Sequence, residues 1–352
     1  MPSRPKFQTA VLATLALAFA LPLPATAGAT LAYVKNPLHP VVFAAADDGS
    51  GARKVAAGRS PRVSPDGQWI VYLHEGPKHA QELKLAPAAG GAGRTLMVGW
   101  RESFYLAFSP DSTSIAALKG PELGKVALTV IDLASGRQTQ LAKGYFSGFS
   151  FSPDGNRIAY SRSGRETYPP RSDVYAIDAP IPGKVYVRAP QPQALTKDHR
   201  SQDPLWGPDG RIVFVKTVDA KKRKYGPKNE LYLMDEAGQH VKRLTHTKVA
   251  PLLQGLFPTE WSADGSRLLA EFEGQDVSYA VTVNPKSGSQ SPVAKTGEGG
   301  FVGTALASDG SAVLGFTGGF EPGPKHDVAA VAYGGGKPRL LAKGAYEPAW
   351  SR

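Results

Sequence analysis

A short turn sequence that recurs along the chain constrains its fold more than any other feature. Each of its six copies holds an Asp followed by Gly or Ser, and in three of them Ser-Pro precedes the Asp. The copies are Ser64–Gly67, Ser109–Ser112, Ser152–Gly155, Gly207–Gly210, Ser262–Gly265 and Ser308–Gly310. The Asp residues lie 45, 43, 55, 55 and 45 positions apart. Because Pro fixes φ for the second place of a type I turn and Gly suits the fourth, each copy predicts a hairpin corner.

A short run of strand-forming residues follows every corner. These runs are Trp69–Tyr72, Ser114–Ala117, Arg157–Tyr160, Arg211–Phe214, Arg267–Ala270 and Ala312–Gly315. An apolar residue such as Phe108 or Trp261 often precedes the corner, and two further β-rich runs follow, as in Leu231–Asp235 and Lys242–Thr245. Four strands in a unit of about 45 residues is the pattern of a β-propeller blade.

The two ends of the chain together supply one further blade. Glu347–Ser351 predicts an inner strand that stops where its corner should begin, and Leu31–Val34, Val41–Ala44 and Lys54–Ala56 predict its three partners. We therefore predict an all-β, seven-bladed propeller, closed by pairing the N-terminal strands with the C-terminal strand. Closure protects the sheet edges. A six-bladed ring with a distorted last unit is the alternative, because the last corner lacks its Pro.

The whole ring is expected to form one domain, since no linker interrupts the repeats. Residues 1–27 are predicted to be a signal peptide and residues 28–352 the propeller. The predicted blades cover residues 28–58 together with 345–352, and then 59–100, 101–144, 145–199, 200–248, 249–299 and 300–344.

The N-terminus predicts export from the cytoplasm. Arg4 and Lys6 give a positive start, Ala10–Leu21 is apolar apart from one Thr, and Ala25–Ala27 is a small-residue cleavage site. An apolar run this short cannot span roughly 30 Å of hydrocarbon. No Cys follows it, so no lipid anchor is expected. We expect the mature chain in the periplasm or outside the cell.

The charge balance indicates the kind of partner. The chain carries 41 Lys and Arg against 30 Asp and Glu, a formal charge of +11, and removal of the signal peptide leaves +9. Such a balance favours an acidic protein surface or another anionic component of the cell envelope, including a membrane surface contacted peripherally. Nucleic acid is not expected as a partner of an exported chain, and we expect a monomer. With no cysteine, disulfides and thiolate chemistry are excluded.

The corners and the strands around them resemble the repeat of the TolB family of periplasmic propeller proteins. The resemblance rests on the run from Ser-Pro-Asp-Gly into an Ile-Ala-Tyr strand, as in Ser152–Tyr160, and on Leu231–Thr245, and it extends over the mature chain. It implies a propeller and a protein-binding role. The TolB family differs in having six blades behind a separate N-terminal α/β domain, for which this chain leaves no room before Leu31.

No motif of a known chemistry is present. The chain lacks a Gly-x-Ser-x-Gly elbow, a phosphate-binding Gly-rich loop, a His-Glu-x-x-His pair and an EF-hand pattern. We interpret the corner Asp residues as turn residues that bond to nearby backbone rather than as calcium ligands. We therefore predict a non-enzymatic protein without a cofactor or metal.

Two sets of residues are candidates for binding. The first belongs to segments that enter the inner strands and so converge on the mouth of the central channel: Arg101, Glu102, His199, Arg200, Glu260 and Glu347. The second belongs to two long loops between the second and third strands of their blades: Arg165, Tyr168, Arg171, Lys221, Lys222, Arg223, Lys224 and Tyr225. Loops lengthened at one face of a constant framework are typical of a binding surface.

These observations predict an exported protein that binds a protein or an anionic envelope component through its loop-rich face. One alternative is a hydrolase or lyase that uses Glu102, His199, Glu260 or Glu347 at the channel mouth. Another is a protein held at a membrane surface by charge.

Overall fold

The computed structural model describes residues 29–77, 80–99, 106–120, 125–165, 171–184, 190–218, 228–247, 253–274, 278–294, 301–318 and 326–351. Three of its sheets have four strands each, and all neighbouring strands in them run antiparallel. One is β27(Ala345–Trp350)-β1(Thr30–Lys35)-β2(Val41–Ala46)-β3(Arg53–Ala57), the next is β4(Arg59–Val63)-β5(Trp69–Glu75)-β6(Gln81–Pro87)-β7(Arg94–Val98), and the third is β23(Val302–Leu306)-β24(Ala312–Phe316)-β25(Val328–Ala332)-β26(Arg339–Ala342).

The two remaining sheets are larger because neighbouring units share hydrogen bonds. In the seven-stranded sheet the order follows the chain, with β8(Leu106–Phe108), β9(Ser114–Lys119), β10(Val126–Asp132), β11(Gln138–Phe151), β12(Arg157–Ser163), β13(Asp173–Asp178) and β14(Gln193–Ala194). The other contains β15(Ser201–Trp206), β16(Ile212–Val218), β17(Lys228–Met234), β18(Lys242–Arg243), β19(Leu253–Trp261), β20(Leu268–Gly274), β21(Ser278–Val283) and β22(Gln290–Pro292).

The sequence predicts separate strands in each unit, whereas the structure joins some neighbouring units by a shared strand or a shared strand contact. β11 is a single strand whose first half pairs with β10 and whose second half pairs with β12, so it is the outer strand of one unit and the inner strand of the next. β17 and β19 meet in parallel at one residue pair, Asn229 and Gly255. No helix in the described part of the chain has the length and apolarity needed to cross a membrane.

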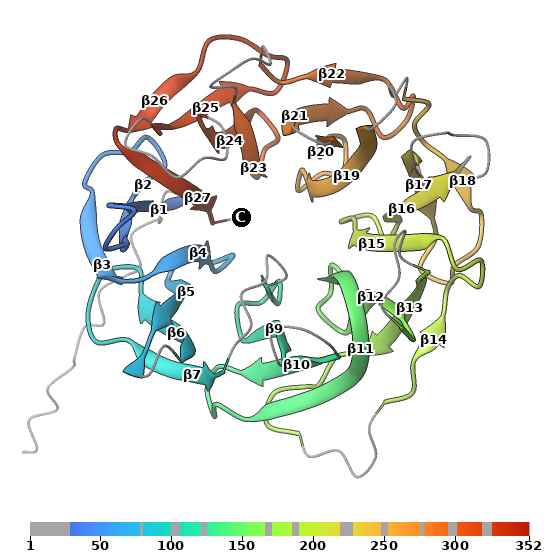
Figure 1. The fold of residues 1–352 in the computed structure, drawn as a ribbon, viewed down its shortest axis with the longest axis horizontal. Helices are drawn as coiled ribbons and strands as arrows, with labels where there is room; N and C mark the ends of the chain where they lie inside the picture. Colours follow the sequence, from blue (N-terminus) through green and yellow to red (C-terminus); the bar gives the residue numbers. More distant parts are fainter. Residues whose placement is uncertain are drawn as a thin grey trace, which may run out of the picture.

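The units stand side by side around a central opening, which makes the molecule a β-propeller (Figure 1). The first strand of each unit lies innermost, as β4, β15, β19, β23 and β27 show. The Ser-Pro-Asp-Gly corners join first to second strands at what we call the corner face. Because the strands alternate in direction, the connections between second and third strands lie at the opposite face, called here the insertion face.

The ends of the chain close the ring, as the sequence predicts. β1 pairs antiparallel with β27, with Leu31 opposite Trp350 and Val34 opposite Tyr346. The Thr30 amide donates to Ser351 Oγ at 2.8 Å, and the Ser351 amide donates to Thr30 O at 2.9 Å. The first and last described strands thus belong to one sheet.

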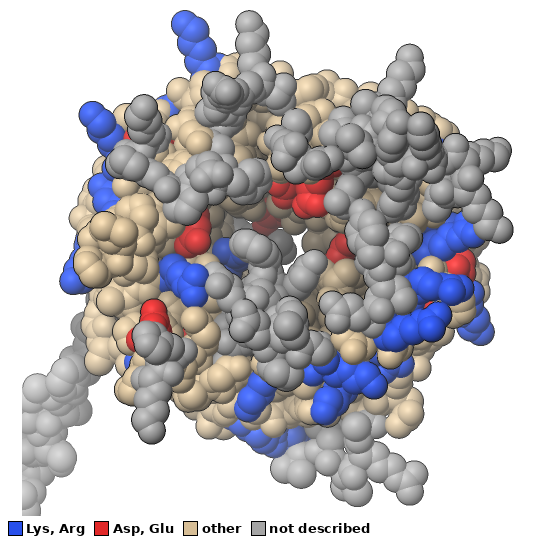
Figure 2. All heavy atoms as spheres, in the orientation of Figure 1, with Lys and Arg blue, Asp and Glu red and all other residues tan. Residues whose placement is uncertain are grey.

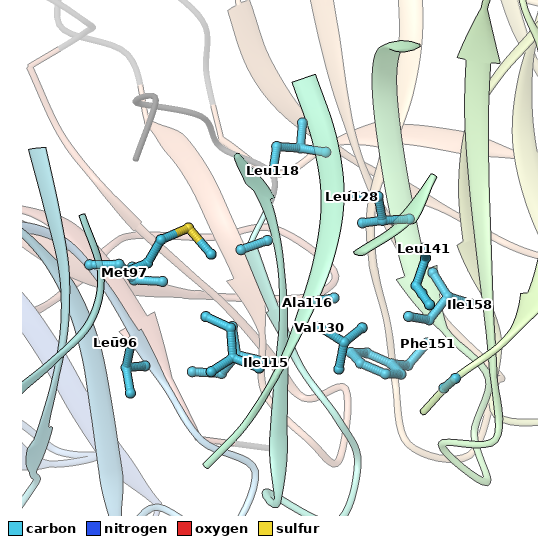
Figure 3. Close-up of a cluster of buried hydrophobic side chains, with 14 of the residues drawn as sticks. Leu96, Met97, Ile115, Ala116, Leu118, Leu128, Val130, Leu141, Phe151 and Ile158 are labelled. Carbon is cyan, nitrogen blue, oxygen red and sulfur yellow. The ribbon is translucent and has the colours of Figure 1, made fainter. Parts of the chain in front are cut away.

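The hydrophobic core lies between neighbouring units and not at one central place. Figure 3 shows a cluster in which Leu96 and Met97 from β7 pack toward Ile115 from β9, with Leu128 and Ile158 farther along. Alternate residues of a strand pack against the neighbouring units on opposite sides, because successive side chains point to opposite faces of a sheet. Thus β16 buries Ile212 and Phe214 toward one neighbouring unit and Val213 and Val215 toward the other.

Each Ser-Pro-Asp-Gly corner is closed by a repeated set of hydrogen bonds. In the third copy Ser152 Oγ donates to Asp154 Oδ1 at 2.5 Å and accepts from the Arg157 amide at 2.9 Å. Asp154 Oδ1 also accepts from the Asn156 amide at 3.0 Å. Equivalent bonds occur at Ser64, Ser109 and Ser262. The prediction that the corner Asp serves its turn is confirmed.

The aromatic residues before the corners pack into the core, as expected. Trp206 and Trp261 are only 6% and 8% exposed and belong to interfaces between units. The guanidinium of Arg157 lies 5.5 Å from the Trp206 ring, and that of Arg211 lies 5.7 Å from the Trp261 ring. Each Arg follows the corner of the preceding unit, so these cation–π contacts link neighbours around the corner face.

We expect Ser152→Ala to lower the free energy of unfolding by about 1 kcal/mol, because the partly buried Arg157 amide loses its acceptor. Urea unfolding would measure the change. Ser287→Ala, which removes an exposed hydroxyl on a surface turn, is the control and should have little effect. Equal stability of the two variants would show that the corner hydroxyl does not stabilise the fold.

Candidate functional site

The inner strands are irregular at a recurring position. β4, β11, β15, β19 and β23 each show a register shift against their second strand a few residues before the corner, and β27 shows one against β1. Such β-bulges twist a strand and redirect a side chain, and they are frequent near active sites. The bulges therefore mark the part of the inner strands where polar side chains are placed beside the central opening.

Three bulge residues that are not Gly have left-handed backbone conformations. These are Ser60, Asp203 and Glu347, with φ of 53°, 48° and 49°. Each comes directly before a Pro and stands at the same place in its repeat. Positive φ costs free energy for residues with a Cβ, so the surrounding contacts must hold these conformations in place.

Glu347 and Glu260 accept hydrogen bonds that join neighbouring inner strands. Glu347 Oε2 accepts from the Ser60 amide at 2.6 Å, and Glu260 Oε2 accepts from the Leu306 amide at 2.6 Å. The Arg62 guanidinium lies near both carboxylates. Burial lowers the pKa of Arg62, and the negative charges of Glu347 and Glu260 oppose that shift. Both carboxylates thus tie one unit to the next within the channel lining.

Asp203 occupies the most unusual position on the inner strands. Its amide donates to Ser161 Oγ at 3.3 Å, and Ser161 Oγ lies 2.5 Å from Ser147 Oγ. Its Oδ1 atom is buried and has no hydrogen-bond partner among the residues that the structure describes. Burial, together with the charge of Glu273, raises the pKa of Asp203 to about 8 despite the Ser147 hydroxyl.

The acidic character extends from Asp203 to β20. Burial and the neighbouring Glu271 raise the pKa of Glu273 to about 7, and burial raises the pKa of Glu271 although Ser278 donates a hydrogen bond to it. In Figure 2, Asp and Glu side chains gather at the hollowed centre of the face beside β19. These carboxyl groups hold protons more strongly than exposed ones do.

A basic cavity lies where β12, β13 and β15 meet at the insertion face. It has a volume of about 410 Å³ and is lined by Ser163, Gly164, Arg165, Arg171 and His199. In Figure 2, Lys and Arg side chains gather over β12 and β13. The cavity joins the end of one second strand, the start of a third strand and the entry to the next inner strand.

The imidazole of His199 is fixed by the buried carboxylate of Asp173. Nδ1 of His199 lies 2.6 Å from Asp173 Oδ2, and the His199 amide donates to Asp173 Oδ1 at 2.9 Å. Asp173 is 5% exposed, whereas 63% of the His199 side chain is exposed. With Nδ1 bonded to Asp173, the other ring nitrogen of His199 is available on the exposed side.

The predicted site residues therefore separate into three groups. Arg165 and Arg171 from the loop set meet His199 from the channel set at the basic cavity, while Glu260 and Glu347 lie on inner strands. Arg200 is exposed beside the cavity, and its amide donates to Asp198 Oδ1 at 3.0 Å. The remaining candidates lie outside the described residues: Arg101, Glu102, Tyr168, Lys221, Lys222, Arg223, Lys224 and Tyr225.

Sequence reasoning missed Asp173, Asp203 and Arg62. A signal for Asp203 existed, because Ser60-Pro61 and Asp203-Pro204 occupy the same place before their corners, as Glu347-Pro348 does before the chain end. Asp173 has no such signal, since a single Asp at the start of a strand is common. Within the described ranges, no three His, Cys, Asp or Glu side chains are grouped so that they could hold a metal ion.

Comparison with solved structures identifies the fold. The β-propeller domain of the trilobed protease from Pyrococcus furiosus matches with a TM-score of 0.62 and 15% identity, covering 89% of this chain and 92% of that one. TolB from Acinetobacter baumannii matches with a TM-score of 0.53 and 18% identity, covering 91% and 82%. An oligogalacturonate lyase in complex with manganese matches with a TM-score of 0.57 and 14% identity, covering 90% and 85%.

These identities establish a β-propeller that resembles the propeller of TolB, and they establish the fold alone. No protein-family model and no curated protein sequence matches the chain.

The buried carboxyl of Asp203 should make stability depend on pH. Its folded-state pKa of about 8 lies above the value of about 3.9 in an unfolded chain, so the folded state keeps a proton that the unfolded state has lost. Stability from this group is complete below about pH 4 and is lost as pH rises to about 8. Asp203→Asn should therefore become more stable than the wild type as pH rises from 5 to 9.

Urea unfolding at a series of pH values would measure this difference. Glu236→Gln, which removes an exposed carboxylate, is the control and should follow the wild-type curve. Parallel curves for Asp203→Asn and the wild type would contradict a raised pKa of Asp203.

Proposed function

We propose that this chain is an exported, seven-bladed propeller that binds an anionic partner, a protein or a component of the cell envelope, through its insertion face. The convergence of Arg165, Arg171 and His199 on one open cavity carries the proposal. Two guanidiniums beside an oriented imidazole attract an anion, and guanidinium geometry suits carboxylate and phosphate groups.

The blade number is supported by the sheet topology. The three four-stranded sheets count as one blade each. The seven-stranded sheet divides at β11 into two units of four strands that share this strand, and the eight-stranded sheet divides between β18 and β19. A total of seven follows when each unit is counted as one blade.

The cellular setting of the proposal depends on the sequence. The charged start, the apolar run and the small residues before Gly28 favour export to the periplasm or beyond. A formal charge of +9 on the mature chain would favour an anionic partner over long range as well as at the cavity. We propose that the protein acts as a monomer, because the closed ring needs no second copy to cover its sheet edges.

A second candidate function, a hydrolase or lyase, is favoured by the Asp173–His199 pair. An imidazole held at Nδ1 by a buried carboxylate can use its other nitrogen to take up or release a proton. The oligogalacturonate lyase of similar fold indicates that a propeller can carry an activity toward an acidic carbohydrate. The described residues include no group of three His, Cys, Asp or Glu that could hold a metal ion, and we place binding first.

Charge reversal tests the binding function directly. We expect Arg165→Glu with Arg171→Glu to weaken binding of the mature chain to immobilised polygalacturonate and to phosphatidylglycerol vesicles by about tenfold or more at constant ionic strength, because two charge-assisted contacts are lost. Surface plasmon resonance and vesicle sedimentation would measure these affinities.

A matched control reverses two exposed charges at the corner face. Lys286 and Lys337 lie in turns between third and fourth strands, far from the cavity along their strands. Lys286→Glu with Lys337→Glu changes the net charge equally and should leave most of the binding intact. Equal weakening by both pairs would indicate attraction by net charge alone and would contradict a binding surface on the insertion face.

A further inference from the structure

We propose that the cavity lined by Arg165, Arg171 and His199 is a subsite for one phosphate group, carried by a ligand as a phosphate monoester. This inference rests on the proposed function and specifies the chemistry recognised by the same face. It depends on which groups surround the cavity, on how they are held, and on the charge they present.

Three of the residues that line the cavity have donor side chains, and they come from three separate segments. Arg165 follows the end of β12, Arg171 precedes β13, and His199 precedes β15. A phosphate monoester presents three terminal oxygens and nearly two negative charges, so it can accept from donors on three sides. A single carboxylate has two oxygens and one charge, which one guanidinium already satisfies in a bidentate pair. The arrangement therefore favours phosphate.

Asp173 gives His199 a fixed orientation toward such a ligand. It binds both the ring and the backbone amide of His199, at 2.6 Å and 2.9 Å. Because Nδ1 is engaged by Asp173, the other ring nitrogen of His199 is the one placed to meet a ligand. The φ of His199 is 54°, and this uncommon conformation is maintained by the same two contacts. Asp173 is thus a positioning residue, since it acts through His199.

The segment that carries His199 is held at several further points. Thr196 Oγ1 donates to Asp173 Oδ1 at 3.3 Å and accepts from the Val174 amide at 2.9 Å. Asp198 pairs with Lys216 Nζ at 2.6 Å and accepts from Ser201 Oγ at 2.8 Å. Partial burial of Asp198 opposes ionisation, but these hydrogen bonds keep its pKa low. Among the described residues around His199, the carboxylates of Asp173 and Asp198 are therefore both engaged in hydrogen bonds.

The opposite wall of the cavity is also ordered by local hydrogen bonds. Ser163 Oγ donates to Arg165 O at 2.5 Å and accepts from the Arg165 amide at 3.3 Å. At Gly164, an added Cβ would meet no atom within 4 Å, so this wall is open. With a volume of about 410 Å³, the cavity has room for a phosphate together with part of the group that bears it.

Isothermal titration calorimetry with small anions tests the inference on the mature chain. We expect inorganic phosphate and glucose 6-phosphate to bind, and acetate and glucuronate to bind at least tenfold more weakly at equal ionic strength. Arg165→Gln and Arg171→Gln should each weaken phosphate binding by about tenfold, whereas Lys286→Gln should not change it. Equal binding of glucuronate and glucose 6-phosphate, or no binding of either, would overturn the proposal.

The role of Asp173 is tested by a double-mutant cycle. Asp173→Asn and His199→Gln should each weaken phosphate binding, and together they should weaken it no more than His199→Gln alone, because Asp173 acts through the imidazole. His199→Gln leaves the buried carboxylate in place, so its result stands even if Asp173→Asn unfolds the chain. Wild-type affinity of His199→Gln would exclude His199 from the site.

Vesicles distinguish a soluble phosphate ligand from a lipid headgroup. Phosphatidic acid exposes a phosphate monoester, whereas phosphatidylglycerol carries a diester. If glucose 6-phosphate displaces the chain from phosphatidic acid vesicles, the soluble phosphate and the lipid headgroup bind the same cavity. Retention of the chain on both kinds of vesicle despite saturating glucose 6-phosphate would contradict the subsite. In that case, loss of vesicle binding in the Arg165→Glu, Arg171→Glu variant would still support the proposed function.

Discussion

The antiparallel pairing of β1 with β27 is the contact on which the rest of the structure depends. Each unit is apolar on both faces, so it is buried only when it has a neighbour on each side. Leu31 and Tyr33 pack toward the last unit of the chain, while Ala32 and Val34 pack toward the second. Without the terminal pairing two apolar faces and two strand edges would be exposed, and the chain has no disulfide to hold them together.

Closure also determines what the inner strands can do. A ring of fixed circumference holds each inner strand against the next, and backbone amides at these contacts need acceptors. Glu260 and Glu347 supply carboxylate oxygens for this purpose, and the bulges bring polar side chains into the same region. The unfavourable φ angles of Ser60 and Asp203 are therefore maintained by the closed ring rather than by local sequence preference.

The sequence predicted what is determined locally and by repetition. The corner motif forms its hydrogen bonds within a few residues, so the corners, the strands after them and the terminal pairing follow from pattern alone. The residue-before-Pro pattern marks the place of Asp203, but the bulges depend on contacts between units, so that pattern does not show that the Asp203 carboxyl is isolated. Likewise His199 was placed with Glu260 and Glu347 at the channel mouth, and its partner Asp173 stands 26 residues earlier. Only folding brings His199 to the same cavity as Arg165.

The two charged regions of the insertion face do not cancel each other. Burial raises the pKa values of Asp203 and Glu273 to about 8 and about 7, with further increases from Glu273 on Asp203 and from Glu271 on Glu273, so a large fraction of these groups is protonated near neutral pH. The guanidiniums of Arg165 and Arg171 remain charged over the same range. An approaching anion therefore meets less repulsion from Asp203 and Glu273 than two fully ionised carboxylates would exert.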